Sequence, residues 1–283
     1  MKVSIGITTR NRQEILPRAI TSALEQAYAP KQVVVIDDAS EGNPRAIAPS
    51  FPGVRWLFNN RPEGLMRNRN RLMQESDTEF FVSLDDDAWF LRQDEIAVAV
   101  EALRRDPKIA AIAFDILSPD RPSPRERTPA KPVAAFVGCG HILRLSMVRE
   151  VGWYADLPGD YGSEEGDLCL RLLNHGCEVV QLPGVHVWHQ KEWSRRDWFG
   201  THASGVCNDL AMAVMRCPFP YVFFVLPGKI FSQLWFACCN PRFFGSALYG
   251  ICRFFVQLPR CWGHRKVVSA SAYREFVRRS RSN

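Results

Sequence analysis

Residues 79–87 read EFFVSLDDD, an apolar and aromatic run that ends in three aspartates. The run predicts a buried strand at 79–84, and in α/β sheets the carboxyl ends of strands are where ligands bind. Three adjacent carboxylates repel one another, and a divalent cation with oxygen ligands relieves that repulsion. Side chains alternate along an extended backbone, so Asp85 and Asp87 can face one side. The alternative is a solvated acidic turn that caps the following helix.

The segments on either side of this run alternate between strand and helix patterns. Such alternation predicts a mostly parallel sheet with helices on both faces. Residues 118–132 contain five prolines and are predicted to form a loop. Strands are predicted at 3–8, 33–37, 54–58, 79–84, 109–116, 178–182 and 185–189, and helices at 15–27, 65–75, 93–105 and from residue 195 onward.

The composition is that of a globular protein that can bury a sizeable core. The chain has 283 residues, 46% of them hydrophobic and 23% charged, which excludes a disordered or collagen-like protein. Nine cysteines are too few for a disulfide scaffold, and no C-x-x-C pair points to zinc or redox chemistry. The N-terminal MKVSIGITTR is too short and polar for a signal peptide. We therefore expect a cytoplasmic protein.

Charge is distributed unevenly along the chain. From Arg216 to the end there are eleven Lys/Arg and one acid, so the last 68 residues carry a net charge of +10. The first 215 residues carry −4, and the whole chain therefore carries +6. Lys229, Arg242 and four prolines interrupt the apolar stretch 217–252, so no ordinary transmembrane span is expected, with a re-entrant hairpin as the alternative. Aromatic stripes flanked by arginines favour peripheral contact of 216–283 with an anionic membrane surface.

Two other partners are weighed for this tail. Its stripes could instead pack on the rest of the chain or on a second subunit, with the charges simply solvated. Nucleic-acid binding is not expected, because no recognised nucleic-acid-binding module is present.

Two further predicted strand ends carry polar side chains. Thr8 and Arg10 follow the first strand, and Asp38 follows the second. A carboxylate there can accept a hydrogen bond from a nucleobase, and arginines such as Arg10, Arg67 and Arg69 can neutralise a diphosphate. Each residue alone is more simply a turn or cap residue. Together they predict one crevice that binds a nucleotide.

Six segments of the chain form a recognisable series: VSIGITTRNR (3–12), VVVIDDAS (33–40), GLMRNRN (64–70), LDDD (84–87), SEEGDLCLRLLNHG (163–176) and LPGVHVWH (182–189). In order and spacing, these segments resemble glycosyltransferase family 2, whose members are inverting nucleotide-sugar transferases with the GT-A fold. The resemblance covers roughly residues 1–200. It implies a GT-A (Rossmann-like), mostly parallel sheet flanked by helices, with a C-terminal helical extension.

The domain division that follows has a catalytic domain and a tail. The GT-A domain would span 1–215, with a nucleotide-sugar half at about 1–117 and an acceptor half at about 133–200. Residues 216–283 would form the basic, aromatic, membrane-associated tail. Within the acceptor half, Gly138, Cys139 and Gly140 could allow close backbone approach to the acceptor.

The resemblance assigns the donor site to four residues beside the metal site. Thr8 and Asp38 would hold the base of the nucleotide. Arg69 and Asn70 would lie near the rest of the donor. These residues fall in the three matched segments that surround the predicted strand ends.

The metal site follows from the LDDD segment. It looks like the family's D-x-D motif, so Asp85 and Asp87 would hold Mn²⁺ or Mg²⁺ that bridges the diphosphate, with Asp87 the most direct ligand. His189 corresponds to the family's histidine after the last strand, which can approach the metal. A lone histidine is more often structural, so packing is the alternative role for His189.

The resemblance places the catalytic base at Glu165. The family has an aspartate there, and glutamate keeps the carboxylate but adds a methylene group, so Glu164 and Asp167 are alternative bases. A base within reach of the acceptor hydroxyl removes its proton as the nucleotide diphosphate leaves. Simple capping of a helix by these acids is compatible with that role.

The resulting expectation is an enzyme, an inverting glycosyltransferase of hexosyltransferase type (EC 2.4). It would move a sugar from a nucleotide-diphosphate sugar to a hydroxyl of a glycan or lipid-linked acceptor in cell-surface glycan synthesis, on the inner face of the membrane. One alternative is a sugar-phosphate nucleotidylyltransferase, which would be expected to have a glycine-rich basic loop where this chain has TTRNR. The other is a non-catalytic, membrane-bound GT-A-like scaffold, against which the intact acidic residues argue.

Overall fold

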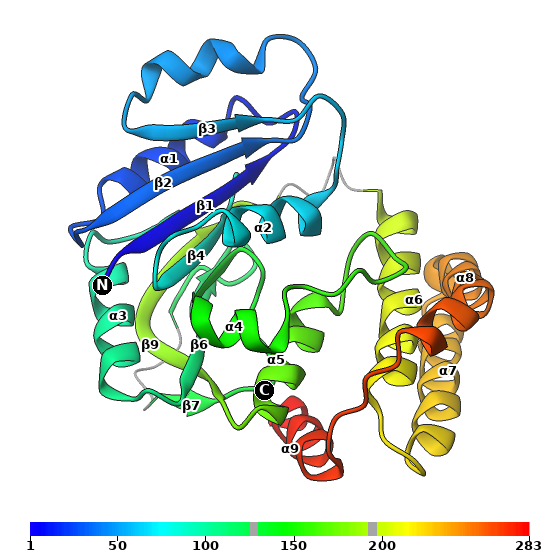
Figure 1. Cartoon of the computed structure of the whole chain (residues 1–283). Helices are drawn as coiled ribbons and strands as arrows, with labels where there is room; N and C mark the ends of the chain where they lie inside the picture. Colours follow the sequence, from blue (N-terminus) through cyan, green and yellow to red (C-terminus); the bar gives the residue numbers. More distant parts are fainter. Residues whose placement is uncertain (125–129, 192–196, 283) are drawn as a thin grey trace. The chain divides into compact units, whose positions relative to one another are not determined.

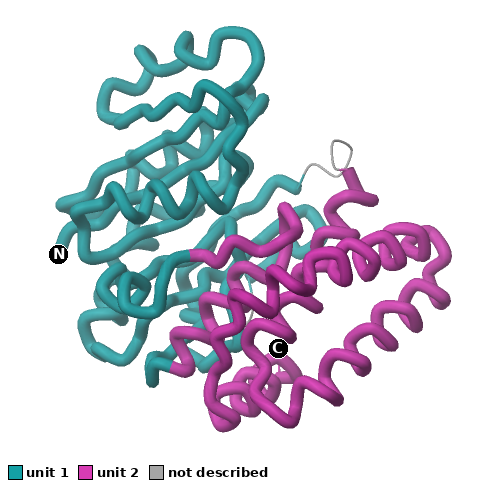
Figure 2. Tube along the Cα trace, turned by 45° about the vertical axis from the view of Figure 1, so that its right-hand side comes forward, with its two compact units in different colours: residues 1–153, 175–191 teal, residues 154–174, 192–283 magenta. Residues whose placement is uncertain are grey.

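The computed structural model describes residues 1–124, 130–191 and 197–282, and its chain forms two compact units. Unit 1 comprises Met1–Trp153 and His175–Lys191, and unit 2 comprises Tyr154–Asn174 and Glu192–Asn283 (Figure 2). The predicted boundary after residue 215 does not coincide with this division. Residue 215 lies inside unit 2, one residue before the end of α6 (Trp198–Arg216), and the predicted boundary stays a prediction.

Unit 1 holds the sheet of the molecule (Figure 1). Its helices are α1 (Leu16–Leu24), the 3-10 helix η1 (Pro44–Ser50), α2 (Leu65–Gln74), α3 (Glu95–Arg105) and α4 (Leu145–Val151). Its strands are β1 (Val3–Thr9), β2 (Lys31–Asp37), β3 (Val54–Phe58), β4 (Phe80–Asp85), β5 (Ala88–Phe90), β6 (Ile109–Leu117), β7 (Lys131–Pro132), β8 (Gly140–Arg144) and β9 (Glu178–His189).

The predicted α/β sheet is confirmed, and its strands run in both directions. In the described residues the order is β3-β2-β1-β4-β8-β6-β9-β5, with β7 beside β9. Strands β3, β2, β1 and β4 are parallel, whereas β8 runs antiparallel to both β4 and β6, and β5 and β7 run antiparallel to β9. The sheet is therefore parallel where the predicted strand ends lie and mixed beyond β4.

The two strands predicted at 178–182 and 185–189 form one strand, β9. Its pairing with β6 shifts register between Ala113, which faces Gln181, and Asp115, which faces His186. The extra β9 residues bulge out of the ladder there, and they include Gly184 with a φ of +91°. Pro183 and Gly184, which separate the two predicted strands in the sequence, lie in this bulge.

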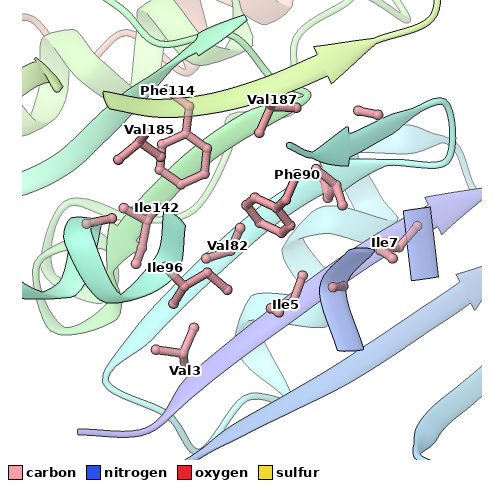
Figure 3. Packing of buried hydrophobic residues seen from close by; sticks show 14 of the residues in the cluster. Val3, Ile5, Ile7, Val82, Phe90, Ile96, Phe114, Ile142, Val185 and Val187 are labelled. Atoms are coloured by element: carbon pink, nitrogen blue, oxygen red, sulfur yellow. The ribbon is translucent and has the colours of Figure 1, made fainter. Parts of the chain in front are cut away.

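Both faces of the parallel strands are buried. Val3, Ile5 and Ile7 of β1 share one apolar cluster with α1 and α3, as Figure 3 shows for Ile96 of α3. The opposite face carries Gly6, where an added Cβ would lie 2.5 Å from the Phe81 ring and 3.0 Å from a methyl group of α2. Because helices cover both faces of this sheet, polar groups are accommodated where the strands end.

Unit 2 is helical in its described residues. Apolar side chains of α6 pack against α8 around Val206, Leu210 and Phe254. The helices are α5 (Glu164–Asn174), α6 (Trp198–Arg216), α7 (Val222–Cys239), the 3-10 helix η3 (Pro241–Phe243), α8 (Phe244–Gly263) and α9 (Ala270–Arg281).

The apolar stretch of unit 2 is less interrupted than its sequence indicates. Pro227 and Pro259 lie inside α7 and α8, and Lys229 of α7 pairs with Asp209 of α6 at 2.5 Å. Lys229 is the one charged residue in the sequence of α7, and its charge is neutralised within unit 2. Among the described residues, α7 alone is long and apolar enough to cross a membrane by length and composition, with a mean hydropathy of 1.5 and 11% of its residues buried. The expectation that no ordinary transmembrane span is present stays a prediction, with α7 as the candidate by those two criteria.

Candidate active site

The carboxyl ends of β1, β2 and β4 bring the predicted polar residues to one edge of the sheet in unit 1. The strand register places Thr8 beside Asp85 and Thr9 beside Asp37. Thr8 is buried, and Arg10 follows β1 as an exposed side chain. The sequence therefore predicted this juxtaposition, because parallel strands end at the same edge.

Two of the three aspartates are held by an arginine to which sequence reasoning assigned no role. Arg12 Nη1 donates to Asp86 at 3.1 Å and to Asp87 at 2.5 Å, and Thr9 Oγ1 donates to Asp86 at 2.8 Å. Burial raises the pKa of Asp86 to about 7, although the charge of Arg12 opposes this shift. The position of Arg12 within the quoted VSIGITTRNR segment was the available sign of its importance.

Asp87 is a buried carboxylate that contacts both Arg12 and His189. Its Oδ1 lies 3.3 Å from His189 Nε2, and its Oδ2 accepts from Arg12. Burial acts to raise the pKa of Asp87, but His189 and Arg12 outweigh it and lower that pKa. Asp87 is therefore held in its charged form, which is the form that binds cations.

Asp85 is paired with the predicted donor-site arginine. Arg69 Nη2 donates to Asp85 Oδ1 at 2.5 Å, and the Arg69 side chain is only 2% exposed. Arg69 thus places a buried positive charge beside Asp85. Asn70, the next residue of α2, is half-buried.

Asp38 anchors the segment that leads into α2. Its carboxylate accepts from Asn59 Nδ2 at 2.8 Å and from the backbone N–H groups of Glu63 and Gly64 at 2.8 and 2.9 Å. Burial acts to raise the pKa of Asp38, but these hydrogen bonds outweigh it and lower that pKa. Asp38 is thus charged at the carboxyl end of β2. Its oxygens already accept hydrogen bonds from three groups of unit 1.

One cluster in unit 1 has the composition of a metal site. Ligand atoms of Asp85, Cys139 and His189 all lie within 4.8 Å of one another, and Asp87 lies beside His189. Thiolate and imidazole groups suit Zn²⁺ or Co²⁺, and the carboxylate oxygens suit Mn²⁺ and Mg²⁺. The structure thus brings the predicted ligands Asp85, Asp87 and His189 together and adds Cys139. Cys139 was expected only to allow close backbone approach to the acceptor, and it was missed as a metal ligand because such ligands were sought only among paired cysteines.

The three candidate bases lie in the first turn of α5, in unit 2. Asp167 is fully buried, and its two oxygens accept from Arg216 Nε at 2.6 Å and from Arg171 Nε at 2.8 Å. Glu164 is buried, whereas Glu165 is half-buried. Of the three acids, Asp167 is thus committed to an ion-pair network inside unit 2.

The chain resembles curated proteins over a limited region. It is 29% identical over 89 residues to the putative colanic acid biosynthesis glycosyl transferase WcaA of Escherichia coli, and 29% identical over 91 residues to the GalNAc(5)-diNAcBac-PP-undecaprenol beta-1,3-glucosyltransferase of Campylobacter jejuni. Each alignment covers 30% of this chain. It covers 32% and 29% of the two relatives, so the chain matches about a third of their length.

Solved structures share the fold at low sequence identity. Residues 1–349 of S. aureus TarS, in complex with UDP-GlcNAc, superpose with a TM-score of 0.66 at 14% identity, covering 85% of this chain and 74% of that one. The mannosyltransferase PcManGT of Pyrobaculum calidifontis, with GDP-Man and Mn²⁺, gives 0.59 at 16% identity over 98% and 78%. These similarities confirm the predicted GT-A fold.

The family profile described as glycosyl transferase family 2 matches residues 4–147. The match includes the ends of β1, β2 and β4, the three aspartates and Cys139. Since it spans half of the chain and contains most of the cluster described above, the chain belongs to glycosyl transferase family 2.

Proposed function

We propose that this protein is an inverting glycosyltransferase that uses a nucleotide-diphosphate sugar as donor and a hydroxyl of a glycan or lipid-linked molecule as acceptor. The observation that carries the proposal is the convergence of Asp85, Asp87 and His189 at the carboxyl edge of β1 and β4. Structural neighbours are described with UDP-GlcNAc or GDP-Man, and one relative is named for an undecaprenol-linked substrate. These names support a donor and an acceptor of the same classes here.

A divalent cation would be held by Asp85 and His189, with Asp87 beside them. When bound, Mn²⁺ or Mg²⁺ offsets the negative charge that builds on the leaving diphosphate. One structural neighbour is described with Mn²⁺. Arg12 and Arg69 hold the adjacent carboxylates close together, because each guanidinium neutralises part of their repulsion. Thr8, Arg10, Asp38 and Asn70 would contact the donor around this centre.

We assign the base to Glu165. The two oxygens of Asp167 are occupied by Arg171 and Arg216, and Glu164 is buried, which leaves Glu165 as the more accessible acid of the three. Its carboxylate would take the proton of the acceptor hydroxyl while that oxygen bonds to the anomeric carbon. The bond from this carbon to the diphosphate breaks on the opposite face, which inverts the configuration.

Donor binding and turnover test these assignments separately. In a thermal-shift panel of nucleotide sugars with Mn²⁺, at least one donor should raise the unfolding temperature beyond the effect of Mn²⁺ alone. Asp87→Asn should abolish that added stabilisation, and Glu101→Gln, which alters an exposed acid on α3, should retain it. Glu165→Gln should keep donor binding but lower the rate of transfer by about 10²–10⁴-fold.

The proposal has clear contrary outcomes. If no nucleotide sugar stabilises the protein beyond Mn²⁺, or if Asp87→Asn binds the donor as the wild type does, the donor-site assignment is wrong. If Glu165→Gln retains the wild-type rate, the base is another group. Nucleotide-sugar turnover that is unchanged by Asp87→Asn would favour the scaffold alternative.

We further propose that unit 2 contacts the cytoplasmic face of an anionic membrane through what we call the aromatic face of α7 and α8. This face is made of large apolar side chains that unit 2 leaves exposed, and the most exposed aromatic residue, Phe224, is 76% accessible. The residues follow helical spacing on both helices, which gives each helix one exposed apolar side. They are Phe224, Phe231 and Trp235 of α7, and Phe244, Leu248, Phe255 and Trp262 of α8.

The charges of unit 2 refine the membrane proposal. Unit 2 contains fourteen Lys/Arg and nine Asp/Glu, so its net charge is +5 rather than the +10 of the tail alone. Several tail cations pair with acids of unit 2, such as Arg253 with Asp160 and Arg260 with Asp156. Arg242 and Lys266 are exposed at the ends of α8, beside the aromatic face. Insertion of the apolar side chains should thus supply most of the membrane affinity. The positive charge should supply the preference for anionic lipid.

Vesicle binding tests the aromatic face. The full chain should co-sediment with phosphatidylglycerol-containing vesicles and less with pure phosphatidylcholine. Replacing Phe231 and Trp235 together by serine should remove binding to both. Leu91→Ser, which alters an exposed leucine of unit 1, should leave binding unchanged. Wild-type binding by the double variant would contradict the proposal, and so would a stable dimer that buries this face and ignores vesicles.

A further inference from the structure

The cysteine of the metal cluster has a position that the strand register fixes. Gly140, the first residue of β8, pairs with Leu84 of β4 in antiparallel register. Cys139 lies in the turn directly before Gly140, and Asp85, the last residue of β4, directly follows Leu84, so the thiol and the carboxylate start from positions next to this pair. An added Cβ on Gly140 would lie 2.6 Å from Ile116 Cδ1 and 3.4 Å from Val187 Cβ, so tight packing holds the backbone beside Cys139 in place.

The third group of the cluster comes from a different strand. His189 ends β9 and pairs with Ala88 of β5, which follows the aspartates directly. Cys139 is 2% exposed and His189 is 7% exposed. The three ligand atoms therefore meet at the inner side of the carboxyl edge, and they come from three separate segments of unit 1.

The spacing of these atoms suits a cation after a small adjustment. Metal–ligand bonds of about 2.0–2.3 Å in a tetrahedral arrangement put ligand atoms about 3.5 Å apart. The atoms of Asp85, Cys139 and His189 lie within 4.8 Å of one another, so no pair has to approach by more than about 1.3 Å. Rotation of side chains can supply such a shift without movement of the strands.

We propose that Cys139 is a ligand of the cation at this site, and that the site consequently prefers Co²⁺ or Zn²⁺ to Mg²⁺. This inference deepens the proposed function, since it concerns the same cation site. On binding, the Cys139 thiol loses its proton to solvent as the sulfur–metal bond forms. Thiolate and imidazole ligands favour these softer ions, whereas Mg²⁺ favours oxygen ligands and keeps its waters.

The alternative role of Cys139 is packing, because it also belongs to the main apolar cluster of unit 1. Cobalt distinguishes the two roles, since only a thiolate bonded to Co²⁺ produces an intense near-ultraviolet charge-transfer band. The metal-free full chain titrated with Co²⁺ should develop this band and saturate at one equivalent. Cys139→Ser should lose the band, and Co²⁺ affinity should fall at least about tenfold, the lower end of the effect of losing an outer-shell partner.

Two controls keep the test interpretable. Cys177→Ser alters another buried cysteine of unit 1 and should keep the band. Circular dichroism should show that Cys139→Ser folds, and Asp85→Asn provides a second variant that should weaken Co²⁺ binding while sparing the thiol. A wild-type protein that binds Co²⁺ without the band, or a band that persists in Cys139→Ser, overturns the inference. Mn²⁺-dependent donor binding by that same wild-type protein would show that the proposed function still holds.

Discussion

Replacing Asp167 by asparagine should destabilise the protein by about 3 kcal/mol while leaving the chemistry of the donor site intact. Asp167 is fully buried, and it is the shared acceptor for Arg216 at 2.6 Å and Arg171 at 2.8 Å. The side chains of Arg216 and Arg171 are 6% and 11% exposed, so water cannot replace the lost charge. The variant therefore leaves the guanidinium group of Arg216 in a dry environment without this counter-ion.

The magnitude follows from the kind of pair that is broken. Removing one partner of a buried ion pair costs about 3–5 kcal/mol, because the other charge stays buried. The lower end applies here, since the asparagine oxygen still accepts one hydrogen bond. For an exposed pair such as Arg260 with Asp156, whose side chains are 45% and 71% exposed, the cost should be below about 1 kcal/mol.

Urea unfolding followed by circular dichroism measures this difference. Asp167→Asn should lower the unfolding free energy clearly more than Asp156→Asn and Glu165→Gln do. At a temperature where Asp167→Asn remains folded, it should keep much more transferase activity than Glu165→Gln. Wild-type stability combined with lost activity in Asp167→Asn would refute the reasoning and make Asp167 the better candidate for the base.

Three further predictions concern stability and its dependence on pH. Burial raises the pKa of Glu95 from 4.5 to about 7, so the folded state retains a proton that the unfolded chain releases; stability measured by urea unfolding should therefore fall as pH rises from about 4.5 to about 7 and then level off, and Glu95→Gln should flatten this trend. Gly250→Ala should lower stability by about 1–3 kcal/mol in the same assay, because its Cβ would lie 2.5 Å from a backbone oxygen of α6, whereas Gly228→Ala has no atom within 4 Å to meet and should not. Asp38→Ala should cost about 1–3 kcal/mol and weaken donor binding, since the N–H groups that lead into α2 lose their acceptor; wild-type thermal shifts with and without donor would contradict this.

Much of unit 1 could be predicted from local patterns. The strand predicted at 54–58 has those bounds in the structure, and the first strand and the helices at 65–75 and 93–105 differ by one or two residues at their ends. In these elements the apolar residues recur at regular spacing, and polar residues mark the end of the element. The direction of β8 and the continuity of β9 could not be predicted, because pairing and bulges depend on neighbours distant in the sequence.

The candidate site divides in a similar way. Asp85, Asp87 and His189 could be predicted because the first two end a strand and all three fall in quoted segments. Arg12 lies in a matched segment but received no role, and Cys139 gave no sign of metal binding, since an arginine in a loop and a single buried cysteine have common structural roles. The ion pairs that commit Asp167 to unit 2 depend on Arg216, which lies 49 residues away.

The sequence by itself determined the α/β pattern, the acidic strand end and the family, because these depend on residues that are near one another in the chain. Only the tertiary structure decided which groups meet at that edge. The pairing of β8 with β4 and of β9 with β5 brings Cys139 and His189 to Asp85 from two distant segments. The folding of α7 and α8 against α6 likewise decided which tail charges are paired and which aromatic side chains stay exposed. Both results depend on long-range packing, which determines the neighbours that a side chain acquires.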